Sequence, residues 1–126
     1  MDQGRLFVLL ITSRGTGRWI VPKGWPMADR DAAGAAAQEA WEEAGVIGQC
    51  MPHSLGSYFY IKTGDGTGDR ACVVEVFPLR VRKLAADYPE RHERRRRWFT
   101  AEQAAQRVQE PALASLLRHF NPQGRR

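Results

Sequence analysis

Three glutamates, Glu39, Glu42 and Glu43, lie close enough together in this sequence to do chemistry as a group. In an α-helix, residues four apart share a face and residues three apart lie beside them. The spacing therefore places the carboxylates on one stripe, where each like-charged pair costs about 0.2–0.5 kcal/mol. A hard divalent cation such as Mg²⁺ takes oxygen ligands and would convert this repulsion into binding. A solvated acidic helix face has the same spacing, so the pattern alone allows both interpretations.

The segment around these glutamates has the strongest helix signals in the chain. Asp31 suits the N-terminal cap, and the alanine-rich run that follows favours a helix despite Gly34. Gly45 suits the C-terminal stop. We therefore predict a helix over residues 31–44, which carries all three carboxylates.

Strand and helix signals alternate along the rest of the chain. Residues 5–12 form an almost wholly apolar run and predict a buried strand. Further strands are predicted at residues 19–21, 54–62, 70–83 with an interruption near Pro78, and 94–99, with loops at 23–30 and 63–68.

Two more helices are predicted near the C-terminus, one capped by Thr100 and one that begins at Pro111 and runs to about His119. The length suits a single domain, residues 1–126. The alternation predicts an α/β (α+β) fold with a mixed sheet.

The composition, with 43% hydrophobic and 26% charged residues, is that of an ordinary globular protein. No apolar run approaches the roughly 20 residues of a membrane span, and we see no signal-peptide pattern. Cys50 and Cys72 suggest neither a disulfide framework nor a zinc site, so we expect a cytoplasmic protein that does not contact membranes. The net charge of +5 predicts an anionic partner, such as a phosphorylated molecule.

The segment from Gly24 to Val46, GWPMADRDAAGAAAQEAWEEAGV, resembles the Nudix box. That box reads G-x5-E-x7-R-E-U-x-E-E-x-G-U, with U a bulky aliphatic residue. Gly24, the three glutamates and the closing Gly45–Val46 match it, while Ala40 is a small residue for its U position.

Two positions depart from the box. Arg30 stands where the box has a glutamate, and Gln38 stands where it has an arginine. In the family these two positions commonly pair with each other, so their joint change removes a salt bridge without leaving either charge alone. The resemblance thus implies an altered set of contacts behind intact carboxylates.

The resemblance implies a Nudix-type α/β/α sandwich and a Nudix pyrophosphohydrolase, which cuts phosphoanhydride bonds with Mg²⁺ or Mn²⁺. By similarity, Glu39, Glu42 and Glu43 would be metal ligands, and Glu42 and Glu43 would be the candidates for the catalytic base. Nudix folds usually begin with a strand before the one at residues 5–12. We therefore expect that first strand to be missing or supplied by a neighbour, which would leave an apolar edge and allow a homodimer.

Basic residues surround the box. The pieces VLLITSR and RWIVPKG resemble the branch that hydrolyses diphosphoinositol and diadenosine polyphosphates. This resemblance implies phosphate contacts from Arg14, Arg18 and Lys23, and Arg70 aligns with a further basic residue of the branch.

Four consecutive arginines, 94–97, precede Trp98 and Phe99, and RRRRWFTAEQA resembles a region of the same branch. Because alternate residues of a strand face opposite sides, at most two of the four can face one pocket. We favour Arg94 and Arg96 as substrate contacts and expect Trp98 and Phe99 to be core residues.

Three functions fit these patterns. The leading one is metal-dependent hydrolysis of a diphosphate bond in a polyphosphorylated substrate, such as a dinucleoside polyphosphate or a diphosphoinositol polyphosphate. A nucleic-acid-binding protein or an RNA 5′-end pyrophosphohydrolase could use the arginine run, although aromatic residues are not interleaved with it for base stacking. The third is a catalytically silent Nudix scaffold that only binds phosphates.

Overall fold

The computed structural model describes residues 5–62 and 68–122 and has the α+β architecture predicted from the sequence. The predicted loop at 63–68 lies almost wholly outside these residues. In chain order the elements are β1 (Phe7–Thr12), β2 (Trp19–Ile20), α1 (Ala32–Ala44), β3 (Val46–Cys50), β4 (Gly56–Lys62), β5 (Arg70–Val76), β6 (Leu79–Leu84), β7 (Arg96–Thr100), α2 (Ala101–Arg107) and α3 (Pro111–Arg118).

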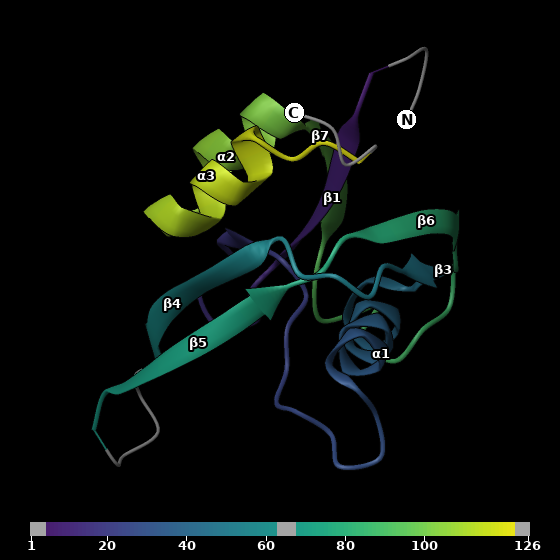
Figure 1. Cartoon of the computed structure of the whole chain (residues 1–126). Helices are drawn as coiled ribbons and strands as arrows, with labels where there is room; N and C mark the ends of the chain where they lie inside the picture. The colour runs from purple at the N-terminus through teal and green to yellow at the C-terminus, as the bar shows by residue number, and fades with distance from the viewer. Residues whose placement is uncertain (1–4, 63–67, 123–126) are drawn as a thin grey trace.

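Strand β1 contributes to two hydrophobic cores, one on each of its faces. Leu10 and Ile11 are both fully buried, and they enter different cores because successive side chains of a strand point to opposite faces. Leu10 packs with Phe99 and with residues of β4, α2 and α3, whereas Ile11 packs with residues of β2, α1 and β3. Figure 1 shows α2 and α3 beside β1 and β7, and α1 beside β3 and β6.

The strand pairings differ from the expected mixed sheet, because all pairings among the described strands are antiparallel. They form a sheet of order β2-β1-β7 and two hairpin-like pairs, β3-β6 and β4-β5. Apolar patterning identifies extended segments but does not show which strands pair with each other.

β1 is the middle strand of its sheet. It pairs with β7 and, at its last two residues, with β2. The expectation that the strand before β1 is missing concerns the chain before residue 5 and lies outside the described residues.

Two local details also differ from the sequence prediction. Residues 46–50 form β3, and the long segment 70–83 is two strands separated at Pro78, which cannot donate to a strand ladder. Phe99 is buried as expected, but Trp98 is 43% exposed. The prediction of a core position for Trp98 is wrong because the two residues are neighbours in β7 and face opposite sides.

Both ends of α1 are confirmed. The Asp31 carboxylate accepts a hydrogen bond of 2.7 Å from the Gly34 N–H, which satisfies one free donor of the first turn. Gly45 adopts a left-handed conformation with φ of 69°, and its N–H donates to carbonyls of the last turn. Thr100 and Gln103 form a capping box at α2.

We predict that Gly45→Ala lowers the free energy of unfolding by at least about 1–3 kcal/mol, because a left-handed φ is strained for a residue with a Cβ. The added Cβ would also meet the Tyr88 ring and the Arg96 guanidinium. Urea denaturation would measure the loss. Gly15→Ala is the matched control, since no atom lies within 4 Å of a Cβ there. Equal stability of the two variants would contradict this account of the end of α1.

Candidate active site

Glu43 is the buried carboxyl group of the site, with only 5% of the residue exposed. Its Oε1 accepts a hydrogen bond of 3.4 Å from the Lys23 N–H and lies 3.8 Å from Nη2 of Arg94. The Glu39 carboxyl group lies close enough to that of Glu43 to raise its pKa. Burial, reinforced by Glu39 and opposed by Arg94, raises the pKa of Glu43 to about 8.

The Glu39–Glu43 pair fits a divalent cation. Two neighbouring carboxyl groups, one of them buried, repel each other when both are charged, and a proton or a cation between them removes this repulsion. Hard cations take such oxygen donors, often one or two carboxylates together with phosphate oxygens. Gly24 supports the arrangement, because a Cβ at that position would overlap the Glu39 carboxylate. The glycine that opens the sequence motif is thus required by close packing against the first glutamate.

Glu42 lies apart from this pair. Its Oε2 accepts a 2.8 Å hydrogen bond from Nε2 of Gln38, one helical turn earlier. Within residues 5–62 and 68–122, no group of three or more His, Cys, Asp or Glu side chains is arranged to hold a metal ion. Of the three predicted ligands, the structure therefore brings together Glu39 and Glu43, while Gln38 holds Glu42.

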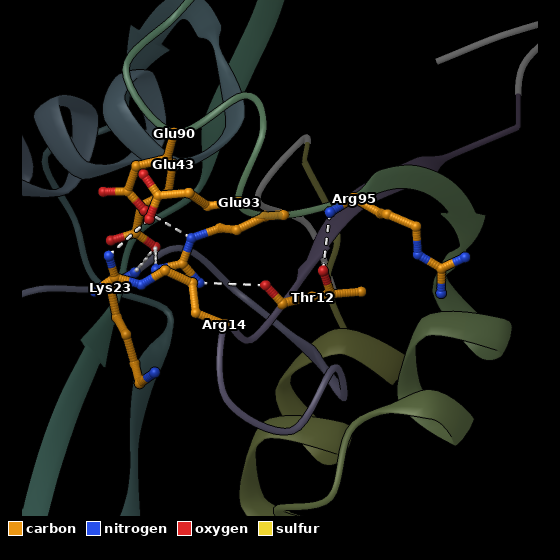
Figure 2. A network of polar contacts seen from close by, with 8 residues as sticks. Thr12, Arg14, Lys23, Glu43, Glu90, Glu93 and Arg95 are labelled. Atoms are coloured by element: carbon orange, nitrogen blue, oxygen red, sulfur yellow. Dashed lines mark hydrogen bonds and ion pairs between the residues drawn. The ribbon is translucent and has the colours of Figure 1, made fainter.

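Arg94 lies behind Glu43, and its guanidinium bonds mainly to other groups of the protein. Its side chain is 9% exposed, and its guanidinium donates to Oε1 of Glu90 at 2.8 Å and to the Thr12 carbonyl at 3.2 Å. Figure 2 shows Glu43, Glu90 and Lys23 gathered on one side of this network, with Thr12 linking it to the Arg95 backbone. Arg94 therefore holds Glu43 from behind.

Arg96 lies on the same side of the strand as Arg94 and also contacts the protein. It donates to the Ala44 carbonyl at 2.8 Å, at the C-terminal end of α1, and its guanidinium lies 4.9 Å from the centre of the Tyr88 ring. Arg95 and Arg97 face the other way and lie 5.5 and 5.7 Å from the Trp19 ring centre. The predicted alternation holds, but Arg94 and Arg96 contact α1 and its supporting loop.

The remaining predicted substrate contacts occupy different settings. Arg14 forms an ion pair with Glu93 at 2.9 Å, and Arg18 pairs with Glu110 at 3.1 Å. Arg70 is exposed at the start of β5, near the tip of the β4–β5 hairpin (Figure 1).

Lys23 is part-buried, and its ammonium lies 4.9 Å from the centre of the Tyr60 ring. Burial lowers the pKa of Lys23, and no ion pair with a carboxylate is formed by this side chain within the described part of the chain. Lys23 is thus a part-buried cation near the Glu39–Glu43 pair that forms no ion pair with it. Such a cation is suited to bind a phosphate.

A groove of about 470 Å³ opens beside these residues, between the loop before α1, one face of α1 and the β4–β5 hairpin. The basic residues that line the groove are Lys23 and Arg30, and neither forms an ion pair among the described residues. From the sequence, Arg30 was identified only as a departure from the motif. Its positive charge at a position where the motif has a glutamate is the feature that could have indicated a groove residue. The groove is also lined by Glu39 of α1 and Glu75 of β5.

A buried and a half-buried carboxyl group on one helix, beside a groove with cations that form no ion pairs among the described residues, are the kinds of group that bind a divalent cation and phosphate. A model of the NUDIX domain matches residues 1–120, and the chain belongs to this family. Nudix hydrolases generally use a divalent metal ion.

Named relatives support the assignment. The chain is 31% identical to Nudix hydrolase 16, mitochondrial, of Arabidopsis thaliana over 92% of its own length and 66% of the relative's. It is 35% identical to diphosphoinositol polyphosphate phosphohydrolase 3-alpha of Mus musculus over 81% and 59%. The chain thus spans between about half and two thirds of the curated relatives it matches.

A solved structure, the Ap4A hydrolase of C. elegans, shares the fold with a TM-score of 0.59 at 23% identity, over 92% of this chain and 84% of that one.

The predicted cytoplasmic location is contradicted by the relatives, because several of them are named as mitochondrial proteins. Composition and cysteine content separate oxidising from reducing surroundings but do not distinguish one reducing compartment from another. None of the helices in the described ranges has the length and apolar character needed to span a membrane.

We predict that Arg94→Met lowers the free energy of unfolding by about 3–5 kcal/mol, the usual cost of breaking a buried ion pair. The change leaves the Glu90 and Glu43 carboxyl groups without their shared cation. Arg97→Met is the control, because Arg97 is exposed and its loss should change stability by no more than about 0.5 kcal/mol. Chemical denaturation of both variants at neutral pH measures the difference, and similar values would show that Arg94 does not support Glu43.

Proposed function

We propose that this protein hydrolyses a phosphoanhydride bond in a polyphosphorylated small molecule, with Mg²⁺ or Mn²⁺ held by Glu39 and Glu43. The observation that carries the proposal is the buried Glu43 carboxyl group one helical turn from Glu39, which lines a groove whose cations form no ion pairs among the described residues. Membership of the Nudix family supports the same reaction.

Each glutamate has a separate role in this proposal. When bound, a divalent ion neutralises charge on the phosphoryl oxygens and lowers the pKa of a coordinated water. Glu39 and Glu43 supply the carboxylate ligands, and Arg94 and the Lys23 N–H keep Glu43 in place. Glu42 stays outside the pair with its carboxylate oriented by Gln38, so it is the residue that accepts the proton of the attacking water.

Lys23 is the proposed phosphate contact closest to the reaction. Its backbone touches Glu43, and its side chain is a part-buried cation in the same groove. Positive groups directed at phosphoryl oxygens supply much of the rate enhancement in phosphoryl transfer. Arg14 and Arg18 are engaged with Glu93 and Glu110, so we propose that they contribute mainly to the positive field around the groove.

The substrate class follows from charge. The net charge of +5 and the groove cations favour a highly anionic molecule, such as a dinucleoside polyphosphate or a diphosphoinositol polyphosphate. A relative bears the name diphosphoinositol polyphosphate phosphohydrolase, which supports the second of these. Nucleic-acid binding by residues 94–97 is less favoured, because Arg94 and Arg96 bond within the fold and Arg95 and Arg97 lie over Trp19.

The reaction is tested by phosphate release from a substrate panel in Mg²⁺ or Mn²⁺, with a chelator control. The panel holds diadenosine polyphosphates, nucleoside triphosphates, ADP-ribose, a diphosphoinositol polyphosphate and 5′-triphosphate RNA. We predict metal-dependent turnover of at least one polyphosphorylated substrate, and we predict that Glu43→Gln lowers kcat by at least about 100-fold.

The control is Glu102→Gln, which makes the same chemical change at an exposed glutamate paired with Arg118. This variant should keep wild-type turnover, and both variants should keep the wild-type circular dichroism spectrum. Wild-type turnover by Glu43→Gln would overturn the assignment of the metal ligands. Metal binding without turnover of any substrate would favour a silent phosphate-binding scaffold.

A further inference from the structure

We propose that Arg30 is a specificity-determining residue, which binds a second phosphoryl group of the substrate at the end of the groove away from Glu39. The inference rests on the proposed function in one respect, that Glu39 marks the position of the diphosphate that is cut. It adds a requirement for substrate shape, because the second anionic group must lie at a distance from the first.

The groove connects the two positions along one face of α1. Ala32, Ala35, Ala36 and Glu39 all line it, at the spacing of residues that share a helix face. Between Ala32 and Glu39 the helix rises about 10 Å at 1.5 Å per residue. Short side chains along this face leave the space between its ends open.

Arg30 is exposed at the far end of this face and has no carboxylate partner in the part of the chain that the structure describes. The neighbouring Asp31 carboxylate is already bonded to the Gly34 N–H. The first carbons of the Arg30 side chain lie near Gly34, where an added Cβ would be 3.5 Å from Cβ of Arg30. The guanidinium is therefore available to a ligand, and its planar donors match a phosphate.

Charge reversal is the feature that separates this chain from the sequence motif. Where the Nudix box has a glutamate, Arg30 changes the local charge by two units toward positive. Glu75 of β5 also lines the groove, so Arg30 offsets a negative charge that would otherwise repel a phosphate. With Arg30 and Lys23 both present, the groove has a cation on each side of the alanine face.

These positions define the chemistry of the ligand. A molecule that carries its diphosphate at one end and another phosphoryl group across a ring-sized spacer would contact Lys23 and Arg30 together. A molecule in which the diphosphate is linked to a neutral sugar would place only an uncharged group beside Arg30. The volume of about 470 Å³ suits a small phosphorylated ring.

Binding can be measured apart from hydrolysis with inositol hexakisphosphate, which has many phosphoryl groups on one ring and no diphosphate bond. Calorimetric titration at constant low salt should show that Arg30→Gln raises its Kd by about tenfold, a loss on the order of one charge-assisted contact. Arg30→Lys should lose less, because it keeps the charge. Glu75→Gln should lower the Kd, because it removes a repulsive charge from the groove.

The matched control is Arg80→Gln, which removes an exposed arginine of β6 that does not line the groove. It separates a local contact from the general effect of net charge. An equal Kd for Arg30→Gln and Arg80→Gln would overturn the proposal, as would an absence of binding by the wild-type protein.

Kinetics then test the link to the reaction. With a diphosphoinositol polyphosphate, Arg30→Gln should raise KM with little change in kcat, the sign of lost uniform binding. With ADP-ribose, which ends in a neutral sugar, the variant should match wild type. An equal rise in KM for both substrates would overturn the specificity role. Binding that depends on Arg30 without any turnover would leave this site in place and count against the proposed hydrolysis alone.

Discussion

The burial of the Glu43 carboxyl group is the constraint on which the rest of the site depends. A carboxylate removed from water costs several kcal/mol unless opposite charge and hydrogen bonds compensate for it. Here the compensation comes from Arg94 and the Lys23 N–H, whereas the neighbouring Glu39 opposes the charged form of Glu43. Each of these needs its own support, from Glu90 and Thr12 behind the arginine to the absence of a side chain at Gly24.

The same constraint explains why α1 is held so firmly at its C-terminal end. The Glu90 N–H donates to the Glu42 carbonyl at 3.0 Å, and Arg96 donates to the Ala44 carbonyl. The core that contains Ile11 packs against the helix through Ala40 and Ala44. A rotation or slide of the helix would break these bonds together, so they fix the positions of the carboxyl groups that α1 carries.

The basic residues near the site fall into two groups, those that bond to other groups of the fold and those that form no ion pairs in the groove. Arg94 and Arg96 contact the acidic helix and its supporting loop, Arg18 forms a part-buried ion pair with Glu110, and Arg14 forms an exposed one with Glu93, which contributes little to stability. Lys23 and Arg30 line the groove and form no ion pairs among the described residues, and these are the cations that we propose bind a ligand. A simple count of arginines near the motif would have assigned most of them to substrate, although hydrogen bonding within the fold uses many of them.

The sequence by itself determined α1, its caps Asp31 and Gly45, and the relative position of the three glutamates, because these depend on residues within a few positions of one another. Only the tertiary structure decided that Glu43 is buried and that Arg94 supports it. It also decided that β3 pairs with β6 and that Trp98 is exposed. These features arise from contacts between segments far apart in the chain, such as Arg94 with Thr12, and local sequence patterns do not specify such contacts.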